Sequence, residues 1–461
     1  MRKNKKADNN LFNGLKVAAV SLGCAKNLVD TEEVLGFLLE SGAKIIADPS
    51  KADLIFVNTC GFIEEAQQEA VNTLLEMAAL KKQGKQFLVA AGCLVEVYGN
   101  SLASLIPQID GVIGTHGYRN LKHLLKLVLQ GYKPYYRPKP GLSYRGLKTR
   151  MITSASHSVN VRIAEGCDNR CSYCLIPSIR GSYQSRDEKD IIAEISDLLE
   201  RGTKEIVLIA QDTTAYGLKN KDSSLADLIE KILTIKKDFW LRIMYTYPSR
   251  IEERLLKLIA SEKRICNYLD IPIQHVDNKI LQNMGRHYTN SELSCLIEKV
   301  RNQVPGIALR TTCMVGFPGE TLKEFSNLVD FIKKNPFENM GSFVYSGQKH
   351  TAAFRLHSRV AKRVAKKRRN ILMAIQQERS FRHNLSLVGK KMFVLIDRVD
   401  PRRRGYYFGR TEQQAPDVDG MIYLRSEKNL KPGDWVEAGI DAAADYNLLS
   451  LRTKYLEHLP Y

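Results

Sequence analysis

The sequence has 461 residues, of which 44% are hydrophobic and 26% charged, with a mean hydropathy of −0.26. At roughly 150 residues per domain, this length predicts about three domains. The composition excludes disordered and collagen-like chains, and no stretch approaches the ~20 uncharged apolar residues that a membrane helix needs. The basic N-terminal segment Met1–Lys6 precedes no apolar signal region, so we expect a cytoplasmic protein with no membrane partner.

Basic side chains exceed acidic ones, with 69 Lys and Arg against 50 Asp and Glu, a net charge of +19 and a pI near 9.4. This excess favours an anionic partner such as RNA or an RNA-rich particle, the alternative being a merely basic enzyme. Part of the excess lies in Arg359–Arg369, where we expect a solvated or phosphate-contacting surface. Its cations are Arg359, Lys362, Arg363, Lys366, Lys367, Arg368 and Arg369.

Taken in chain order, the first 130 residues alternate apolar runs with helical patterns. They predict buried strands and amphipathic helices, namely strands at 15–20, 53–57 and 87–91 and helices at 31–41 (with an acidic first turn) and 62–82. Strands alternating with helices form a parallel sheet covered on both faces, so we expect an N-terminal parallel α/β domain over residues 14–133. Residues 134–146 are rich in Pro, Gly and Tyr without a period and predict a linker.

A second alternating series follows the linker. It predicts strands at 161–164, 205–210, 241–246, 268–273, 307–315 and 342–345, separated by helices at 187–201, 225–235, 251–261, 290–304 and 322–333. Six β/α units are fewer than the eight of a complete barrel, so we expect a partial (β/α)6 barrel over residues 151–384. Residues 385–458, with strands at 392–397 and 435–440 and turns between them, predict a small all-β barrel.

The most specific motif is Cys167-x3-Cys171-x2-Cys174, in a loop after a strand. The nine cysteines are odd in number and no signal peptide precedes them, which argues against a disulfide framework. Three thiolates this close can hold three corners of a 4Fe–4S cluster, leaving one iron free for a substrate. Zinc-binding or accidental cysteines are the alternative, although a structural zinc normally has four protein ligands.

A second set of cysteines follows the three N-terminal strands, because Cys24, Cys60 and Cys93 each come at or shortly after a strand end. In an open parallel sheet the carboxyl ends of the strands form the ligand-binding edge, so these thiols can converge and hold a second cluster. Buried apolar cysteine is the alternative. The remaining cysteines, at 266, 295 and 313, lie in or beside apolar runs and are expected in the core.

Together these residues resemble the radical S-adenosylmethionine (SAM) methylthiotransferases over nearly the whole chain. The motif continues as Ile176-Pro177-Ser178-Ile179-Arg180-Gly181, which is also typical of that family. The resemblance implies an N-terminal methylthiotransferase domain, a radical SAM core and a C-terminal TRAM barrel.

By the same resemblance, the cofactors are two 4Fe–4S clusters and SAM. Cys167, Cys171 and Cys174 would hold the cluster at which SAM is cleaved to a radical. Cys24, Cys60 and Cys93 would hold the auxiliary cluster, which carries the sulfur, while a second SAM supplies the methyl group.

The resemblance also implies SAM contacts at Tyr173, beside the third cysteine, and at Val315 and Gly316, where the fifth barrel strand ends. A tight strand-to-helix turn is the alternative reading for Gly316. We expect His275 to be a structural barrel residue rather than a catalytic one. No catalytic residue is expected beyond the cluster ligands.

Within the family, one branch modifies adenosine in tRNA and the other the β-carbon of an aspartate in small-subunit ribosomal protein twelve. The segment Ser21–Asp30 resembles the ribosomal branch, although Ala25 stands where that branch usually has Pro. Residues 385–461 hold 12 Lys and Arg against 11 Asp and Glu, whereas a barrel that grips tRNA should be basic. The acidic loop 415–420 also suits a basic ribosomal protein. We therefore expect the ribosomal substrate.

Two alternatives remain open, a tRNA adenosine methylthiotransferase and a non-enzymatic iron–sulfur protein that binds RNA or senses redox state. The expected partners are ribosomal protein twelve, free or on the ribosome, and a low-potential electron donor of flavodoxin or ferredoxin type. The basic run Arg359–Arg369 adds an expected contact with ribosomal RNA.

Overall fold

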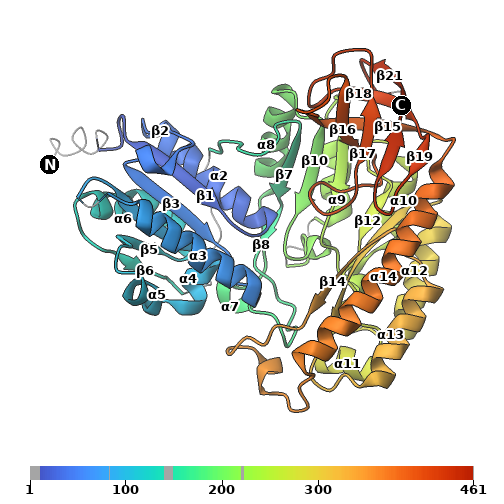
Figure 1. The fold of residues 1–461 in the computed structure, drawn as a ribbon, viewed down its shortest axis with the longest axis horizontal. Helices are drawn as coiled ribbons and strands as arrows, with labels where there is room; N and C mark the ends of the chain where they lie inside the picture. Colours follow the sequence, from blue (N-terminus) through green and yellow to red (C-terminus); the bar gives the residue numbers. More distant parts are fainter. Residues whose placement is uncertain (1–10, 83, 140–148, 220–222, 460–461) are drawn as a thin grey trace. The chain divides into compact units, whose positions relative to one another are not determined.

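The computed structural model describes residues 11–82, 84–139, 149–219 and 223–459 (Figure 1). The chain divides into two compact units. The first holds the described residues up to 153 together with 165–169 and 174–184, and the second holds 154–164, 170–173 and the described residues from 185 on. Among the helices that the structure describes, none is long and apolar enough to cross a membrane.

The first unit is built on a six-stranded sheet in which every neighbouring pair of strands is parallel. The strand order is β2-β1-β3-β4-β5-β6. The strands are β1 (Lys16–Ser21), β2 (Lys44–Ile45), β3 (Leu54–Thr59), β4 (Phe87–Gly92), β5 (Gly111–Ile113) and β6 (Tyr135–Tyr136). The predicted parallel α/β architecture is confirmed. Residues 135–136, predicted as linker, instead pair with β5, and the linker residues 140–146 lie outside the described part of the chain.

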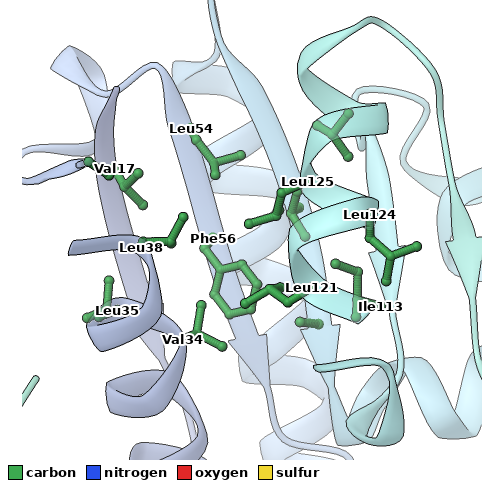
Figure 2. Packing of buried hydrophobic residues seen from close by; sticks show 14 of the residues in the cluster. Val17, Val34, Leu35, Leu38, Leu54, Phe56, Ile113, Leu121, Leu124 and Leu125 are labelled. Atoms are coloured by element: carbon green, nitrogen blue, oxygen red, sulfur yellow. The ribbon is translucent and has the colours of Figure 1, made fainter. Parts of the chain in front are cut away.

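Helices cover both faces of this sheet. On one face α2 (Ala25–Glu40) and α6 (Leu121–Leu129) pack against alternate strand residues, with Phe56 at the centre of the cluster (Figure 2). On the other face lie α3 (Glu64–Leu80), α4 (Cys93–Tyr98) and α5 (Asn100–Leu105). Strands that are buried on both faces have apolar residues at every position, which is why β3 and β4 are recognisable as continuous apolar runs.

Helix α2 begins six residues before the predicted start at Thr31. The polar residues that obscured its first turns are buried rather than solvated. Asn27 donates to the backbone oxygens of Leu22 and Thr59, and Thr31 donates to the oxygen of Asn27. These side chains hydrogen-bond within the protein, so the helix continues back to Cys24 without an amphipathic signal in the sequence.

The second unit contains the partial barrel. Two three-stranded parallel sheets, β11-β10-β7 and β12-β13-β14, are joined by a parallel bridge between Leu241 and Ile265. The six strands are β7 (Ser158–Arg162), β10 (Glu205–Ile209), β11 (Trp240–Ile243), β12 (Tyr268–Asp270), β13 (Ala308–Val315) and β14 (Asn339–Val344). The intervening helices include α8 (Glu188–Glu200), α9 (Leu225–Leu233), α10 (Glu253–Ser261), α11 (Asn278–Asn283), α12 (Asn290–Gln303) and α13 (Leu322–Lys334). The predicted partial barrel is confirmed.

A long helix, α14 (Lys362–Leu387), leads from the partial barrel to a curled seven-stranded sheet, drawn red in Figure 1. Its strands are β15 (Lys391–Val399), β16 (Tyr406–Arg410), β17 (Ile422–Arg425), β18 (Trp435–Gly439), β19 (Ala442–Ala443), β20 (Leu448–Ser450) and β21 (Arg452–Leu456). The predicted all-β C-terminal domain is confirmed.

The C-terminal sheet is fixed to the barrel by a buried ionic network. Arg410 of β16 contacts Glu205 of β10 at 2.8 Å, and Glu205 also accepts from Arg242 of β11 at 2.8 Å. The indole rings of Trp240 and Trp435 meet edge-on, with centroids 4.6 Å apart. Because the contact is buried and specific, the two parts of the second unit form one body.

Candidate functional site with two sets of three cysteines

The N-terminal cysteines lie at one edge of the first unit's sheet. Cys60 and Cys93 directly follow β3 and β4, and Cys24 follows β1 by three residues. These strands are neighbours in the order β1-β3-β4, with Ser21 opposite Asn58 and Thr59 opposite Gly92. The three cysteines therefore follow the carboxyl ends of neighbouring parallel strands, as the sequence predicted. Cys24 is exposed, whereas Cys60 and Cys93 are buried.

Two glycines allow this edge to pack closely. Gly23 has φ +89°, and a Cβ atom there would stand 2.8 Å from the sulfur of Cys60. Gly92 has φ +93°, and a Cβ atom there would stand 2.1 Å from the side-chain oxygen of Asn58. Only glycine adopts these angles without strain and leaves room for its neighbours. The glycine before Cys24 and that before Cys93 are thus part of the site.

Burial favours the protonated form of the Cys60 and Cys93 thiols. Burial raises the pKa of Cys60, and it raises the pKa of Cys93 to about 12. Negative charge on Cys24 or Cys60 would raise the pKa of Cys93 further. The guanidinium of Arg180 acts in the opposite direction on both buried thiols. Iron binding at this edge therefore has to displace protons.

The second cysteine set lies in the loop after β8 (Ala164–Glu165). In the first unit, the amide of Cys167 donates to the oxygen of Gly181 at 3.1 Å, and the sulfur of Cys174 accepts from the amide of Ile176 at 3.4 Å. Backbone donors to sulfur stabilise the thiolate form that metal ligation requires.

Cys171 belongs to the second unit, where a buried arginine faces it. Nη1 of Arg286 lies 3.9 Å from the sulfur of Cys171, and Nη2 donates to the oxygen of Pro272 at 2.7 Å. The guanidinium also lies over the rings of Tyr247 and Tyr288, with centroid distances of 4.7 and 5.5 Å. Burial alone lowers the pKa of Arg286, but its surroundings raise that pKa well above the ordinary value. No motif in the sequence marks Arg286 as a buried cation.

Within the described residues, no three His, Cys, Asp or Glu side chains are close enough to form a site for a single metal ion. A mononuclear site brings every sulfur within about 2.3 Å of one ion. Thiolates that hold a cluster bind different iron atoms and stand farther apart. The donor chemistry of both cysteine sets, thiols with no accompanying carboxylate or histidine ligand, fits iron–sulfur ligation.

Tyr173, a predicted SAM contact, belongs to an apolar cluster of the second unit. Its ring meets Phe317 edge-on with centroids 6.4 Å apart, and Phe317 meets Tyr345 at 5.3 Å. Ile280 and Met284 complete this cluster. The aromatic residue beside Cys174 is therefore held in a largely apolar surrounding.

Val315 and Gly316, the other predicted SAM contacts, lie at the end of β13. The amides of Gly316 and Phe317 both donate to one carboxylate oxygen of Glu320, at 2.6 and 3.2 Å. Arg368 of α14 pairs with Glu320 at 2.7 Å. A Cβ atom on Gly316, whose φ is +75°, would stand 2.4 Å from Cβ of Ala365. Gly316 thus has a structural role in a tight turn, and its contact with SAM stays a prediction.

His275 is fully buried, and its Nδ1 accepts from the amide of Asp277 at 3.0 Å. Burial lowers the pKa of His275 to about 4, so the ring is neutral at physiological pH. The ring closes the turn that leads into α11, which agrees with the structural role expected for this residue.

The loop 415–420 offers less acidic surface to a binding partner than the sequence suggested. Asp419 is used internally, because it pairs with Arg310 of β13, accepts from the hydroxyl of Tyr268 at 2.8 Å and accepts from the amide of Ala415 at 2.9 Å. Only Asp417 of the two aspartates is exposed. The interpretation of this loop as an acidic surface for a basic protein is therefore wrong for Asp419.

The near-neutral charge of the C-terminal sheet also hides an uneven distribution. An aromatic and arginine face, defined here as Arg398, Arg403, Tyr406, Phe408 and Tyr423, lies on β15, β16, β17 and the turn between β15 and β16. The rings of Tyr406 and Tyr423 stack with centroids 5.3 Å apart, and the ring of Phe408 lies tilted against Tyr423 at 4.8 Å. The two exposed guanidinium groups of this face lie 4.4 and 3.7 Å from ring centroids. The net charge of this domain is therefore a poor guide to what it binds.

The basic run at the start of α14 divides into buried and exposed parts. Arg368 is buried in its ion pair with Glu320, whereas Arg363, Lys366, Lys367 and Arg369 are exposed. No acidic side chain occupies the first turn of the helix. Cations at a helix N-terminus are opposed by the helix dipole, so this arrangement costs stability and creates a strongly positive surface.

Three family models match successive parts of the chain. The "Uncharacterized protein family UPF0004" matches residues 16–114, the Radical SAM superfamily matches residues 161–332 and the TRAM domain matches residues 388–451. Each range falls inside one of the domains predicted at 14–133, 151–384 and 385–458, whose boundaries stay a prediction.

Among curated proteins, the chain is 41% identical over 437 residues to the ribosomal protein uS12 methylthiotransferase RimO of Pelotomaculum thermopropionicum, covering 94% of this chain and 98% of that protein. It is 42% identical over 440 residues to the protein of the same name from Clostridium acetobutylicum, covering 95% and 98%. A solved radical SAM methyltransferase, TsrM from Kitasatospora setae with cobalamin and a 4Fe–4S cluster bound, has a TM-score of 0.54 at 16% identity, covering 72% of this chain and 75% of that chain. The last similarity shows the fold alone.

Proposed function

Because this chain belongs to the ribosomal protein uS12 methylthiotransferase (RimO) family, we propose that it adds a methylthio group to the β-carbon of an aspartate in ribosomal protein uS12. The radical SAM domain makes the chain a radical SAM enzyme. The observation that carries the sulfur-transfer part is the placement of Cys24, Cys60 and Cys93 after three neighbouring parallel strands, in a chain that also holds a C-x3-C-x2-C motif.

In this proposal, Cys167, Cys171 and Cys174 hold one 4Fe–4S cluster, and Cys24, Cys60 and Cys93 hold the second. When bound, these clusters and SAM supply the one-electron and sulfur chemistry that protein side chains lack. The chain's own residues prepare both sites. Backbone amides and the buried guanidinium groups face the thiols.

The apolar cluster around Tyr173 would exclude water beside the SAM site, and Val315 and Gly316 would contact SAM at the end of β13. Water exclusion protects a reactive intermediate from side reactions.

The substrate, the electron donor and the compartment belong to this proposal too. We expect the cytoplasm, where ribosomes are, and a flavodoxin- or ferredoxin-type donor, because SAM cleavage requires a low-potential electron.

Contact with ribosomal RNA is supported by two positively charged surfaces. The exposed cations at the start of α14 offer point charges to phosphates, and the aromatic and arginine face offers rings for base stacking. These surfaces are the specific observation that keeps tRNA adenosine as the second candidate substrate. We favour uS12 because the relatives that match 94–95% of the chain carry that name.

The decisive experiment supplies both substrates in parallel. The anaerobically reconstituted enzyme, SAM, sulfide and a reductant are incubated with uS12 and with bulk tRNA, and peptides and nucleosides are examined by mass spectrometry. A methylthio group on an aspartyl peptide is the expected result. The same group on adenosine would overturn the substrate. Absence of 5′-deoxyadenosine under dithionite would instead favour a non-enzymatic iron–sulfur protein.

A further inference from the structure

A buried arginine of the first unit, Arg180, lies beside the N-terminal cysteines. Arg180 is the last residue of α7 (Ile176–Arg180), six positions after Cys174, and is only 4% exposed. Its Nη1 contacts Asp30 at 2.8 Å and both carboxylate oxygens of Glu165 at 3.3 and 3.4 Å. Its Nη2 donates to the side-chain oxygen of Asn27 at 2.6 Å and to the sulfur of Cys93 at 3.5 Å.

The two carboxylates fix the guanidinium in place. Burial by itself lowers the pKa of Arg180, but Asp30 and Glu165 raise it well above its ordinary value, so the charge is permanent. A planar guanidinium held through one nitrogen presents its other nitrogen in a set direction. For Arg180 that direction is toward Asn27 and Cys93.

The contacts of Asn27 show how the surroundings of Cys93 differ for its thiol and its thiolate. Its amide nitrogen donates to Leu22 and Thr59, so its oxygen is an acceptor, and that oxygen lies 3.4 Å from the Cys93 sulfur. A neutral thiol donates to this oxygen. A metal-bound thiolate has no proton to donate, and its remaining contact here is the hydrogen bond from Arg180. Arg180 is therefore placed to stabilise the thiolate form that ligation requires.

Arg180 also joins two parts of the sequence that carry ligands. Glu165 precedes Cys167 by two residues, and Asp30 and Asn27 follow Cys24 on α2. One side chain thus connects the segment of the C-x3-C-x2-C motif to the edge that holds the N-terminal cysteines, entirely within the first unit.

We propose that Arg180 is a positioning residue for the N-terminal cysteine site, which donates a hydrogen bond to the ligand sulfur of Cys93 and supplies positive charge beside it. This inference rests on the proposed function, which assigns Cys24, Cys60 and Cys93 to an iron–sulfur cluster. Charge and hydrogen bonds to sulfur set the potentials of such clusters. Loss of Arg180 should therefore make the cluster harder to reduce and easier to lose.

The test uses the full chain with the other cysteine set removed, so that only the N-terminal cysteines can hold a cluster. The parent carries Cys167→Ala, Cys171→Ala and Cys174→Ala and is reconstituted anaerobically with iron and sulfide. Arg180→Gln and Arg180→Lys are compared in this background by iron content, rate of iron loss to a chelator and midpoint potential from EPR-monitored titration. Arg150→Gln is the matched control, because Arg150 forms a buried ion pair with Glu32 on the same helix α2.

We expect Arg180→Gln to lower the midpoint potential and to speed iron loss about tenfold, the lower end of the effect of ligand-orienting partners. Arg180→Lys keeps the charge but not the two-nitrogen geometry, so it should restore the potential and still lose iron faster than the parent. Arg150→Gln should match the parent in both measurements.

Two results would overturn the proposal in different ways. A parent that takes up no iron would refute the cluster assignment and this role together. A parent that holds iron, with Arg180→Lys and Arg180→Gln unchanged in iron loss and potential, would refute the role of Arg180 alone. If Arg180→Gln does not fold, Arg180→Lys decides, since iron loss at the parent's rate in that variant also refutes the role.

Discussion

The guanidinium of Arg286 lies 3.9 Å from the sulfur of Cys171, and it is buried against the rings of Tyr247 and Tyr288. In the first unit, the guanidinium of Arg180 lies 3.5 Å from the sulfur of Cys93. Each cysteine set thus has a buried arginine that touches one of its sulfurs. A positive charge that is desolvated and fixed by its surroundings acts strongly on a nearby thiolate, because the protein interior screens it weakly.

The first prediction concerns Arg286. Arg286→Met should reduce SAM cleavage by 10- to 100-fold, because residues that orient metal ligands contribute that much to metal affinity or activity. Production of 5′-deoxyadenosine under dithionite measures it. Arg264→Met is the control, since Arg264 also contacts backbone oxygens and an aromatic ring, that of Phe239. Equal losses in both variants would mean that Arg286 only supports the fold.

The second prediction separates the two cysteine sets. Cys171→Ala should abolish SAM cleavage, whereas Cys60→Ala should retain cleavage and lose methylthiolation. The reason is that the two sets lie in different loops and serve different steps. Each variant should bind one 4Fe–4S cluster after full reconstitution, against two for the unaltered chain. Cys295→Ala is the control, because that cysteine is exposed on α12, so the prediction that placed it in the core is wrong.

Full methylthiolation by Cys60→Ala would contradict the assignment of the N-terminal set. A single cluster in the fully reconstituted, unaltered chain would contradict it as well.

The sequence predicted β1, β3 and β4 to within two residues, because strands buried on both sides are continuous apolar runs. The shorter strands β2, β5 and β6 were not predicted. The sequence also placed Cys24, Cys60 and Cys93 at one edge, since parallel neighbours end on the same side. Helix α2 was placed too late because its first turns carry polar side chains that are buried by specific hydrogen bonds. A pattern of hydrophobic and polar residues cannot distinguish such groups from a solvated loop.

The sequence did not predict that Arg180 and Arg286 are buried beside cysteines, for a related reason. Arg180 belongs to the motif Ile176–Gly181, and Arg286 follows a glycine at positive φ. Nothing in the sequence, however, indicates which of the many arginines are buried. Asp419 was misread in the opposite sense, as a surface charge, because its partner Arg310 lies 109 residues away. Pairings over such distances depend on the tertiary fold alone.

The third prediction is a pH dependence at the junction of barrel and C-terminal sheet. Burial raises the pKa of Glu205, but Arg410 and Arg242 overcome this effect and lower the pKa to about 2. A depressed pKa means that the carboxylate stabilises the fold above its unfolded value near 4.5 and that this contribution, about 3 kcal/mol, disappears as the pH falls toward 2.

Glu205→Gln should therefore lower the free energy of unfolding at pH 7 and make little difference near pH 2. Denaturant unfolding across this range measures the difference. Arg410→Met should be more damaging at pH 7, costing about 3–5 kcal/mol, because it leaves the buried carboxylate with only Arg242 and Ser158 as partners. Asp197→Asn, in an exposed pair with Arg201, is the control and should change stability by less than about 1 kcal/mol. A difference between Glu205→Gln and wild type that persists unchanged at pH 2 would contradict this account.

The last prediction concerns the exposed cations of α14. Arg363 lies in the first turn, where the dipole opposes positive charge, and Lys366 and Lys367 are exposed in the second turn, so replacing them should not weaken the helix. Arg363→Gln, Lys366→Gln and Lys367→Gln together should leave methylthiolation of isolated uS12 unchanged and weaken binding to the small ribosomal subunit. If each contacts a phosphate, the salt dependence of binding should lose about 0.7–0.9 in slope for each cation removed. Arg382→Gln, farther along the same helix and paired with Glu378, should leave the slope unchanged. An unchanged slope in the triple variant would exclude a phosphate contact at this surface and leave the aromatic and arginine face as the remaining site for RNA.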